Sequence, residues 1–451
     1  MHLKIHIPNN FFNERSYVVE QLFSEFLTYS VNIQKHSEEY ICIQLENGKK
    51  ILLYDYFFNL IPASETYLNP KYLPTAYSDF FIEQLNVSIP VFYGKKLIQF
   101  DDQTIHCHID CIAMVFFLLS RMEEYIIPSA DMHGRFLAKD SFAGKNNILH
   151  RPLVDELVVF IDRLLEGIGL KRVIKKPIPP IIVSVDIDQP YYWRNHRSIL
   201  TYFIRLARRK EPIKLLPSML ISYYKTLINK TNDPYFAFEE LFNLLKNEDV
   251  KLELTFMTDF STKYDISYRV NEPYLQEIIY LADKNNIPIG IHPSYASVDS
   301  DKLLEKQIKK FKLYFNKPPD YSRQHFLRIN IPNTFKELSS LGIQFDSTLY
   351  FAEEAGFRCG TSRDFYIFDC INRCKLEIKE RPFILMDVTA FLYKKLTPHD
   401  FLQLLIQLYE TIHSMGGNYR ILWHNSNIRP IEWQPYWQVF TQFLKDIKHD
   451  K

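Results

Sequence analysis

The chain has 451 residues, with 54 Lys and Arg against 53 Asp and Glu, a formal net charge of +1. Such a balance gives no overall attraction to nucleic acid or to acidic membranes, so we expect no nucleic-acid partner. Hydrophobic residues make up 47% of the sequence, enough for large cores, and a chain of this length is expected to form two domains.

Cysteine usage and the amino-terminal residues predict a cytoplasmic protein. Six cysteines are spread along the chain without a CxxC pair, which favours reduced thiols over a disulfide framework. Residues 1–14 contain no apolar core followed by a cleavage site, and the longest apolar run, residues 111–119, is too short to span a bilayer.

The first third of the chain predicts a separate α/β domain, residues 1–175, of unknown role. Strand-like segments at 40–44, 50–55 and 91–93 precede helical stretches at 110–124 and 154–167.

A polar cluster in this domain matches no metal or nucleophile motif. It covers residues 120–125, 131–136 and 151–152. We interpret it as an ion-pair network that fixes a loop against a helix end, and a role in substrate binding or domain docking stays open.

A domain boundary is predicted at residues 171–180, where a basic stretch with three prolines precedes an apolar strand. The second domain then covers residues 178–451. Its first strand, 181–185, ends at Asp186 and Asp188, which are two residues apart and therefore point to one side of the strand. The pair is typical of a metal ligand beside a base, although aspartates at a strand end can also cap the next helix.

A basic segment follows at about 194–232. From residue 194 to 230 it holds nine Lys and Arg and a single acid, Glu211, interleaved with apolar residues. One interpretation is a helical insertion with a solvated basic face, and the other is a helical pair at a membrane surface, hence a peripheral membrane contact.

The remaining sequence alternates short apolar runs with amphipathic stretches of helix length, at 272–284, 303–315 and 398–415. This alternation predicts a parallel sheet. Four of the apolar runs end in a reactive side chain, namely His292, Asp346, Asp387 or His424. A fifth run, 252–256, does not. In closed β/α barrels the carboxyl ends of the strands build one shared active site.

Five motifs in this half resemble those of the polysaccharide deacetylases of the NodB-homology type, carbohydrate esterase family 4. They lie at residues 185–188, 291–295, 322–326, 345–348 and 422–425, and the resemblance covers residues 178–451. It implies a distorted β/α barrel of the α/β class and a divalent metal, usually zinc.

The resemblance also implies roles for individual residues. Asp188 and His292 are the implied metal ligands, and His325 is our third because Ala296 occupies the position of the family's second histidine. Asp186 is the implied base, oriented by Arg323, and His424 the implied general acid. We expect substrate contacts from four further residues, Tyr295, Asp346, Arg358 and Trp423. Asp387 is expected either to bond to the acid histidine or to be structural.

The activity implied by the resemblance is metal-dependent hydrolysis of an N-acetyl, or other acyl, group on an amino sugar of a bacterial surface polysaccharide or its precursor. The displaced histidine leaves a second reading open, an inactive barrel that binds glycan or a biosynthetic partner. A third is another hydrolase or a lyase on the same fold. The amino-terminal domain resembles an uncharacterised domain often fused to such deacetylases, which implies no chemistry.

Overall fold

The computed structural model describes residues 2–174, 179–193, 197–208, 213–246, 249–265 and 268–447. Residues 175–178 of the predicted boundary and residues 194–196 and 209–212 of the basic segment lie outside the described residues. The chain divides into two compact units. The first unit is Met1–Pro179, Leu327–Ile384 and Leu408–Tyr419, and the second is Pro180–Phe326, Leu385–Gln407 and Arg420–Lys451.

The first unit contains a mixed six-stranded sheet in the order β2-β1-β3-β4-β8-β7. These strands are β1 (His2–Pro8), β2 (Ser30–His36), β3 (Tyr40–Gln44), β4 (Lys50–Tyr54), β7 (Gly94–Phe100) and β8 (Thr104–Ile109). A hairpin is formed by β5 (Ser78–Ile82) and β6 (Val87–Val91). The helices before residue 180 are α1 (Phe12–Val19), α2 (Phe57–Leu60), α3 (Cys111–Leu119), α4 (Met122–Ile126), α5 (Phe142–Lys145) and α6 (Leu153–Gly167).

The predicted helix at 110–124 is two helices, because Arg121 has the left-handed backbone conformation between α3 and α4. The predicted ion-pair network is confirmed around this residue. Its guanidinium donates to Glu123 at 2.7 Å and to Glu124 at 2.8 Å. The other oxygen of Glu124 accepts from Arg358 at 2.6 Å.

The first unit also takes up later parts of the chain. Its three-stranded sheet has the order β12-β14-β13, with α12 (Asn333–Ser340), β12 (Phe345–Asp346), β13 (Phe365–Asp369) and β14 (Cys374–Glu380). The run ending at Asp346 therefore pairs with β14 instead of joining the sheet of Asp186.

The second unit is built on a five-stranded sheet in the order β11-β10-β9-β16-β15. The strands are β9 (Ile181–Ile187), β10 (Val250–Phe256), β11 (Ile289–Ile291), β15 (Leu385–Met386) and β16 (Tyr419–His424). The register is parallel for β9 with β10, for β10 with β11 and for β15 with β16. This confirms the α/β class and the parallel sheet. The described strands form open sheets and no closed barrel, so the predicted distorted barrel is not confirmed.

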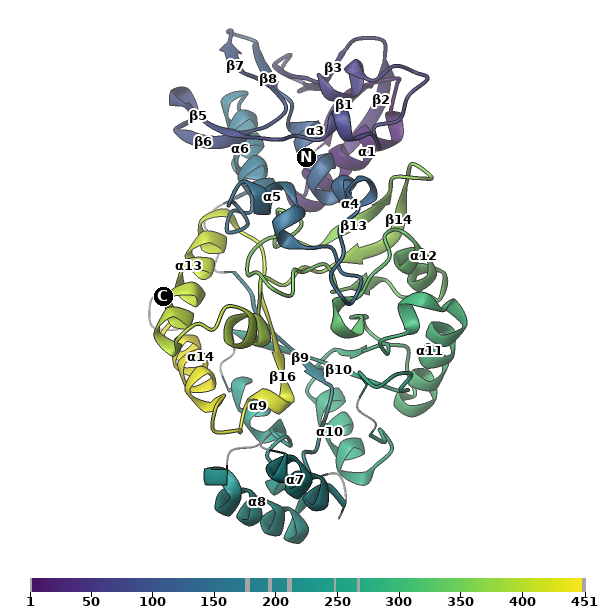
Figure 1. Ribbon diagram of the computed structural model, residues 1–451. Helices are drawn as coiled ribbons and strands as arrows, with labels where there is room; N and C mark the ends of the chain where they lie inside the picture. The colour runs from purple at the N-terminus through teal and green to yellow at the C-terminus, as the bar shows by residue number, and fades with distance from the viewer. Residues whose placement is uncertain are drawn as a thin grey trace. The chain divides into compact units, whose positions relative to one another are not determined.

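Helices flank this sheet, with α10 and α11 on one side of β9, β10 and β16 and α14 on the other (Figure 1). The helices after residue 180 in the second unit are α7 (Arg197–Ala207), α8 (Leu216–Ile228), α9 (Phe238–Leu244), α10 (Pro273–Lys284), α11 (Asp301–Phe315) and α14 (Gln434–Asp446), while α13 (Pro398–Met415) begins in it.

Beyond β11, the segment 320–323 extends the sheet edge. The N–H groups of Asp320 and Arg323 donate to the carbonyl oxygens of Ile289 and Ile291, and the N–H of Ile291 donates to Tyr321. Gly290 permits this approach, since a Cβ there would lie 2.9 Å from the carbonyl oxygen of Tyr321. The pairing carries Arg323 alongside His292.

Candidate metal centre

The carboxyl ends of the strands in the second unit bring six predicted or implied site residues to one edge. Asp186 lies in β9 and Asp188 just after it, and His292 directly follows β11. Arg323 and His325 follow the paired segment at the sheet edge. His424 is the last residue of β16. Because parallel strands end at the same edge, residues far apart in sequence meet there.

Asp188, His292 and His325 form a cluster able to hold a metal ion. One ligand atom from each side chain lies within 4.8 Å of the others. The His292 Nε2 is 3.1 Å from one Asp188 oxygen, and the His325 Nε2 is 3.8 Å from the other. The two ring centroids are 5.0 Å apart.

Every histidine at this edge binds a protein acceptor through Nδ1 and turns Nε2 to the cluster. His292 pairs with the carbonyl oxygen of Arg323 at 2.6 Å. His325 pairs with Asp265 at 2.9 Å, and His424 with Asp387 at 2.8 Å. Such acceptors fix the ring orientation and hold a proton on Nδ1, which leaves Nε2 of His292 and of His325 as the ligand atom.

The cluster suits a cation because a hydrogen-bond acceptor atom of His292 faces an acceptor atom of Asp188. A carbonyl oxygen can only accept, so Nδ1 of His292 carries the proton and Nε2 of the neutral ring holds a lone pair. The Nε2 atom and the Asp188 Oδ1 atom are buried, and neither has a hydrogen-bond partner among the described residues. At 3.1 Å they repel unless a positive charge, a metal ion or an added proton, lies between them.

The electrostatics agree with a site that demands positive charge. Burial alone would lower the pKa of His292, but Asp186 and Asp188 outweigh it and raise that pKa. Burial would likewise raise the pKa of Asp188, yet His325 and His292 bring it well below its ordinary value. An anionic carboxylate with two imidazoles is a donor set typical of zinc.

Asp186 is held ionised beside this cluster. Burial opposes its charge, but the Arg323 guanidinium and the nearby imidazoles lower its pKa below the ordinary value. Arg323 donates to its Oδ1 at 2.7 Å, and the Thr255 hydroxyl donates to the same oxygen at 2.5 Å. Arg323 is itself fixed by a 2.9 Å bond to the Ser184 hydroxyl. The other oxygen of Asp186, Oδ2, is left facing His292 at 3.8 Å.

His424 is placed to carry a proton at the open side of the cluster. Burial lowers its pKa, but the carboxylates of Asp387, Asp188 and Asp186 outweigh this and raise the pKa of His424 to about 10. Its Nε2 is 3.8 Å from Asp188. The His424 and Asp188 side chains keep 15% and 23% of their surface exposed, so solvent reaches the site past them. The expected bond between Asp387 and His424 is confirmed.

The sequence analysis did not predict two residues that contact this site, Asp265 and Thr255. Asp265 lies in the loop after β10, and Thr255 belongs to the strand that has no reactive residue at its end. Hydrogen-bond acceptors on loops leave no periodic signal. Thr255 could have been found by pairing register, since it lies opposite Asp186.

The four predicted substrate-binding residues have different surroundings. Tyr295 lies near the cluster: its N–H donates to Asp265, and its ring centroid is 4.4 Å from that of Tyr264. Trp423 is buried against Phe440. Asp346 and Arg358 belong to the first unit. Asp346 is buried beside Glu380, and Arg358 belongs to the ion-pair network around Glu124.

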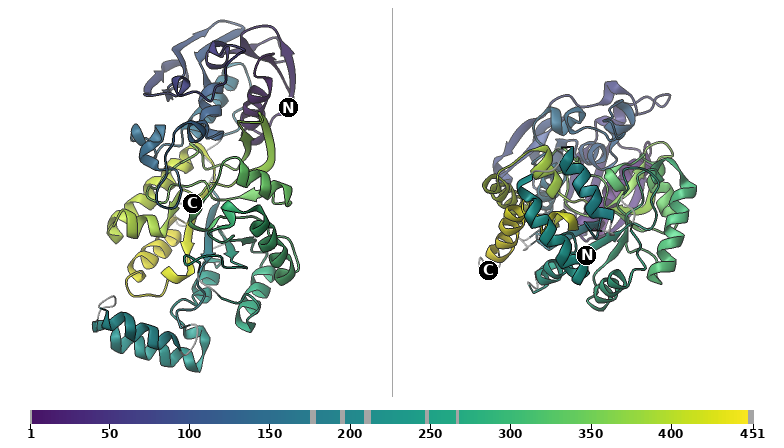
Figure 2. Two further views of the ribbon diagram at one scale, coloured as in Figure 1. Left: turned by 45° about the vertical axis from the view of Figure 1, so that its right-hand side comes forward. Right: turned by 60° about the horizontal axis from the view of Figure 1, so that its bottom comes forward.

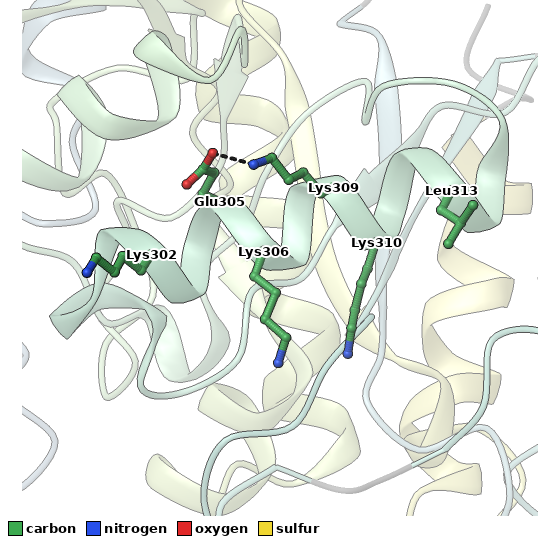
Figure 3. Close-up of a pocket in the computed structure, with 6 residues that line it drawn as sticks. All are labelled: Lys302, Glu305, Lys306, Lys309, Lys310 and Leu313. Atoms are coloured by element: carbon green, nitrogen blue, oxygen red, sulfur yellow. Dashed lines mark ion pairs between the residues drawn. The ribbon is translucent and has the colours of Figure 1, made fainter.

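A separate hollow lies along α11 in the second unit, with a volume of about 390 Å³ (Figure 3). It is lined by Lys302, Glu305, Lys306, Lys309, Lys310 and Leu313. Asp259 pairs with Lys306 and Lys310, and Glu305 with Lys309. None of the predicted site residues lines it, and three of its four lysines are paired with carboxylates.

Comparison with known proteins gives a family only for the amino-terminal part. Residues 3–169 match a family described as "Family of unknown function (DUF7033)". The curated proteins contain no match. Among solved structures, the chain is similar to a protein of Mycobacterium smegmatis described as a "putative polysaccharide deacetylase", with 14% identity and a TM-score of 0.37. The match covers 60% of this chain and 85% of that one, and a TM-score of this size does not establish a shared fold.

Among the described residues, no helix is both long enough and apolar enough to cross a bilayer.

Proposed function

We propose that the second unit is a metal-dependent hydrolase that removes an N-acetyl, or other acyl, group from an amino sugar of a surface polysaccharide or its precursor. The observation that carries this proposal is the convergence of His292, His325 and His424 on Asp188 through their Nε2 atoms. An ionised carboxylate, Asp186, lies beside them. The resemblance of the motifs supports the choice of an amino sugar.

Asp188, His292 and His325 would hold the metal, for which zinc fits the donor set best. When bound, a divalent metal supplies a Lewis acid that polarises the acyl carbonyl and makes water more acidic. The ligand side chains do not themselves transfer protons in this proposal.

Proton transfer falls to two other residues of the chain. As water attacks the acyl carbon, Asp186 accepts its proton at Oδ2, because Oδ1 is already engaged by Arg323 and Thr255. As the C–N bond breaks, His424 donates its Nε2 proton to the leaving amine. Asp387 stabilises the charged imidazole and fixes its orientation. The products are a carboxylate and a free amino sugar.

The test is release of acetate from acetamido sugars by zinc-loaded protein, with polymeric, nucleotide-linked and lipid-linked substrates in parallel. We expect Asp186→Asn and His424→Ala to lower kcat by about 10²- to 10⁴-fold, the usual size of a general acid or base contribution. As matched controls, Asp259→Asn and His399→Ala change the same residue types outside the cluster, Asp259 being the partner of Lys306 and Lys310, and should leave kcat unchanged.

Two outcomes would count against hydrolysis. One is no acetate from any of these substrates, and the other is release that Asp186→Asn leaves untouched. Sugar binding without release would favour the inactive glycan-binding alternative that the displaced histidine suggests.

A further inference from the structure

The second unit exposes an unusual number of large apolar side chains on two helices, α7 and α8. Nine of the twenty-one exposed large hydrophobic residues in the described chain lie between residues 200 and 228. They are Leu200, Phe203, Ile204, Ile213, Leu220, Ile221, Tyr224, Leu227 and Ile228. Patches of this kind on otherwise polar proteins mark interaction sites.

The exposed residues form a stripe along each helix. In α7 the spacing of Leu200, Phe203 and Ile204 places them on one face. In α8 the five exposed residues from 220 to 228 follow the pattern i, i+1, i+4, i+7 and i+8, again one face of a helix. A soluble helix normally turns such a face to the core, whereas here it is exposed.

The opposite faces of the two helices are fixed by one tryptophan, Trp193. Its ring lies 5.9 Å from Tyr202 of α7 and 5.2 Å from Tyr223 of α8, measured between centroids. Its indole N–H donates to Ser222 at 3.0 Å. The apolar stripes are therefore turned away from the packed side, and the helices lie next to one another, as Figures 1 and 2 show.

The helical pair is tied to the segment that follows β9, the strand at whose end Asp186 and Asp188 lie. Tyr192 and Trp193 follow the end of β9, and their N–H groups donate to Asp233 at 2.8 and 2.9 Å. Asn425, next to His424, donates to the carbonyl oxygens of Gln189 and Tyr235. The same short segments thus hold both the pair and the candidate metal centre.

Positive charge accompanies the apolar stripes. The sequence from 194 to 230 has nine Lys and Arg against one acid. On α8, Lys225 follows Tyr224 directly and therefore lies at the edge of the stripe, where its ammonium group can reach outward while its stem covers apolar surface. Lys214 lies in the short 3₁₀ turn Ile213–Leu215, directly before α8 begins at Leu216.

We propose that α7 and α8 form a docking surface for an anionic lipid membrane, with both helices lying in the interface. The apolar stripes would enter the boundary between headgroups and acyl chains, and the flanking cations would meet the lipid phosphates. The charge decides against a second copy of this chain as the occupant, because two such surfaces repel one another. The apolar stripe decides against nucleic acid.

Membrane docking would place the candidate metal centre beside the bilayer. If the deacylation proposed above holds, its substrate is then an amino sugar carried on a lipid at the membrane surface. This last step rests on the proposed function, but the docking does not, because vesicle binding needs neither metal nor turnover.

The test is cosedimentation of the full chain with vesicles of phosphatidylcholine alone and of phosphatidylcholine mixed with phosphatidylglycerol. We expect binding to the mixed vesicles only, weakening as salt is raised. Tyr224→Ser combined with Leu227→Ser should weaken binding by at least about tenfold, since two large apolar groups no longer enter the interface. Lys214→Gln combined with Lys225→Gln should weaken it by about tenfold at low salt.

The matched control is Tyr280→Ser combined with Leu313→Ser, on α10 and α11. These side chains are 65% and 73% exposed, like the 65% and 51% of Tyr224 and Leu227, and their loss should leave vesicle binding unchanged. Wild type remaining in the supernatant with mixed vesicles would overturn the proposal. Vesicle binding by the Tyr224/Leu227 variant equal to that of the wild type would also overturn it. A third such outcome is a wild-type dimer, seen by light scattering, that binds no vesicles and that the Tyr224/Leu227 substitutions convert to a monomer.

Discussion

At the scale of single residues, the candidate metal centre depends on which imidazole nitrogen each histidine turns inward. His325 is the informative case, because it supplies the ligand that Ala296 cannot. Its Nδ1 is held by Asp265, which also accepts from the N–H groups of Ser261, Thr262 and Tyr295. Burial would raise the pKa of Asp265, but the His325 bond and these N–H groups lower it below its ordinary value.

Asp265→Asn should lower zinc affinity by about 10- to 100-fold. The substitution removes the negative charge that orients His325 and makes its Nε2 a stronger metal ligand. The measurement is competition with a chromogenic chelator, which needs no activity. Asp259→Asn, a nearby carboxylate bonded only to lysines and a backbone N–H in the described contacts, is the control. An Asp265→Asn protein that keeps wild-type affinity at a temperature where both proteins are folded would contradict this role.

Much of this centre was predictable from the sequence, but not all of it. Asp186, Asp188, His292 and His424 were predicted because each ends an apolar run, and parallel strands bring such ends together. His325 required the resemblance as well, since it follows no strand. Asp265 could not be predicted, because its contact with His325 depends on how the loop after β10 folds back.

At the scale of secondary structure, the edge of the sheet near β11 sets the position of two site residues. The segment 320–323 pairs with β11 only because Gly290 has no side chain. His292 lies two residues beyond Gly290, and Arg323 two residues beyond Tyr321. Any displacement of this edge therefore moves a metal ligand and the partner of Asp186 together.

Gly290→Ala is expected to lower the free energy of unfolding by about 1–3 kcal/mol, the usual cost of overpacking. The added Cβ would lie 2.8 Å from the Tyr321 ring and 2.9 Å from its carbonyl oxygen, and the backbone cannot move aside cheaply. Chemical denaturation measures the loss, and zinc affinity should fall with it. Gly167→Ala is the matched control, because its Cβ would meet only the terminal methyl of Ile105 at 3.2 Å. Equal stability of the two variants would show that the edge is not tightly packed.

The local sequence pattern predicts short strands but does not determine which strand each of them pairs with. The apolar runs ending at His292 and at Asp346 look alike in sequence, yet β11 pairs with β10, while β12 pairs with β14 in the first unit. A strand of two residues carries too little pattern to specify its partner. Its pairing is decided by long-range contacts.

At the scale of the whole molecule, the compact units are not continuous in sequence. The proline-rich segment at 171–180 predicts a single boundary between two continuous domains. In the structure, however, residues 327–384 and 408–419 belong to the first unit. The reason lies in contacts within that unit: Glu14 pairs with Arg373 at 2.6 Å, and Gln21 accepts from the N–H of Tyr366 at 3.0 Å. The candidate metal centre, in contrast, draws all its residues from the second unit.

The central claim is that Asp188, His292 and His325 bind one metal ion together. The most direct measurement is the metal content of purified, zinc-reconstituted protein, determined for the wild type and for Asp188→Ala, His292→Ala and His325→Ala, with the exposed His399→Ala as control. We expect one zinc per chain in the wild type and the control and a loss in each of the three variants. Wild type without zinc, or a His325→Ala protein that retains it fully, would contradict the account.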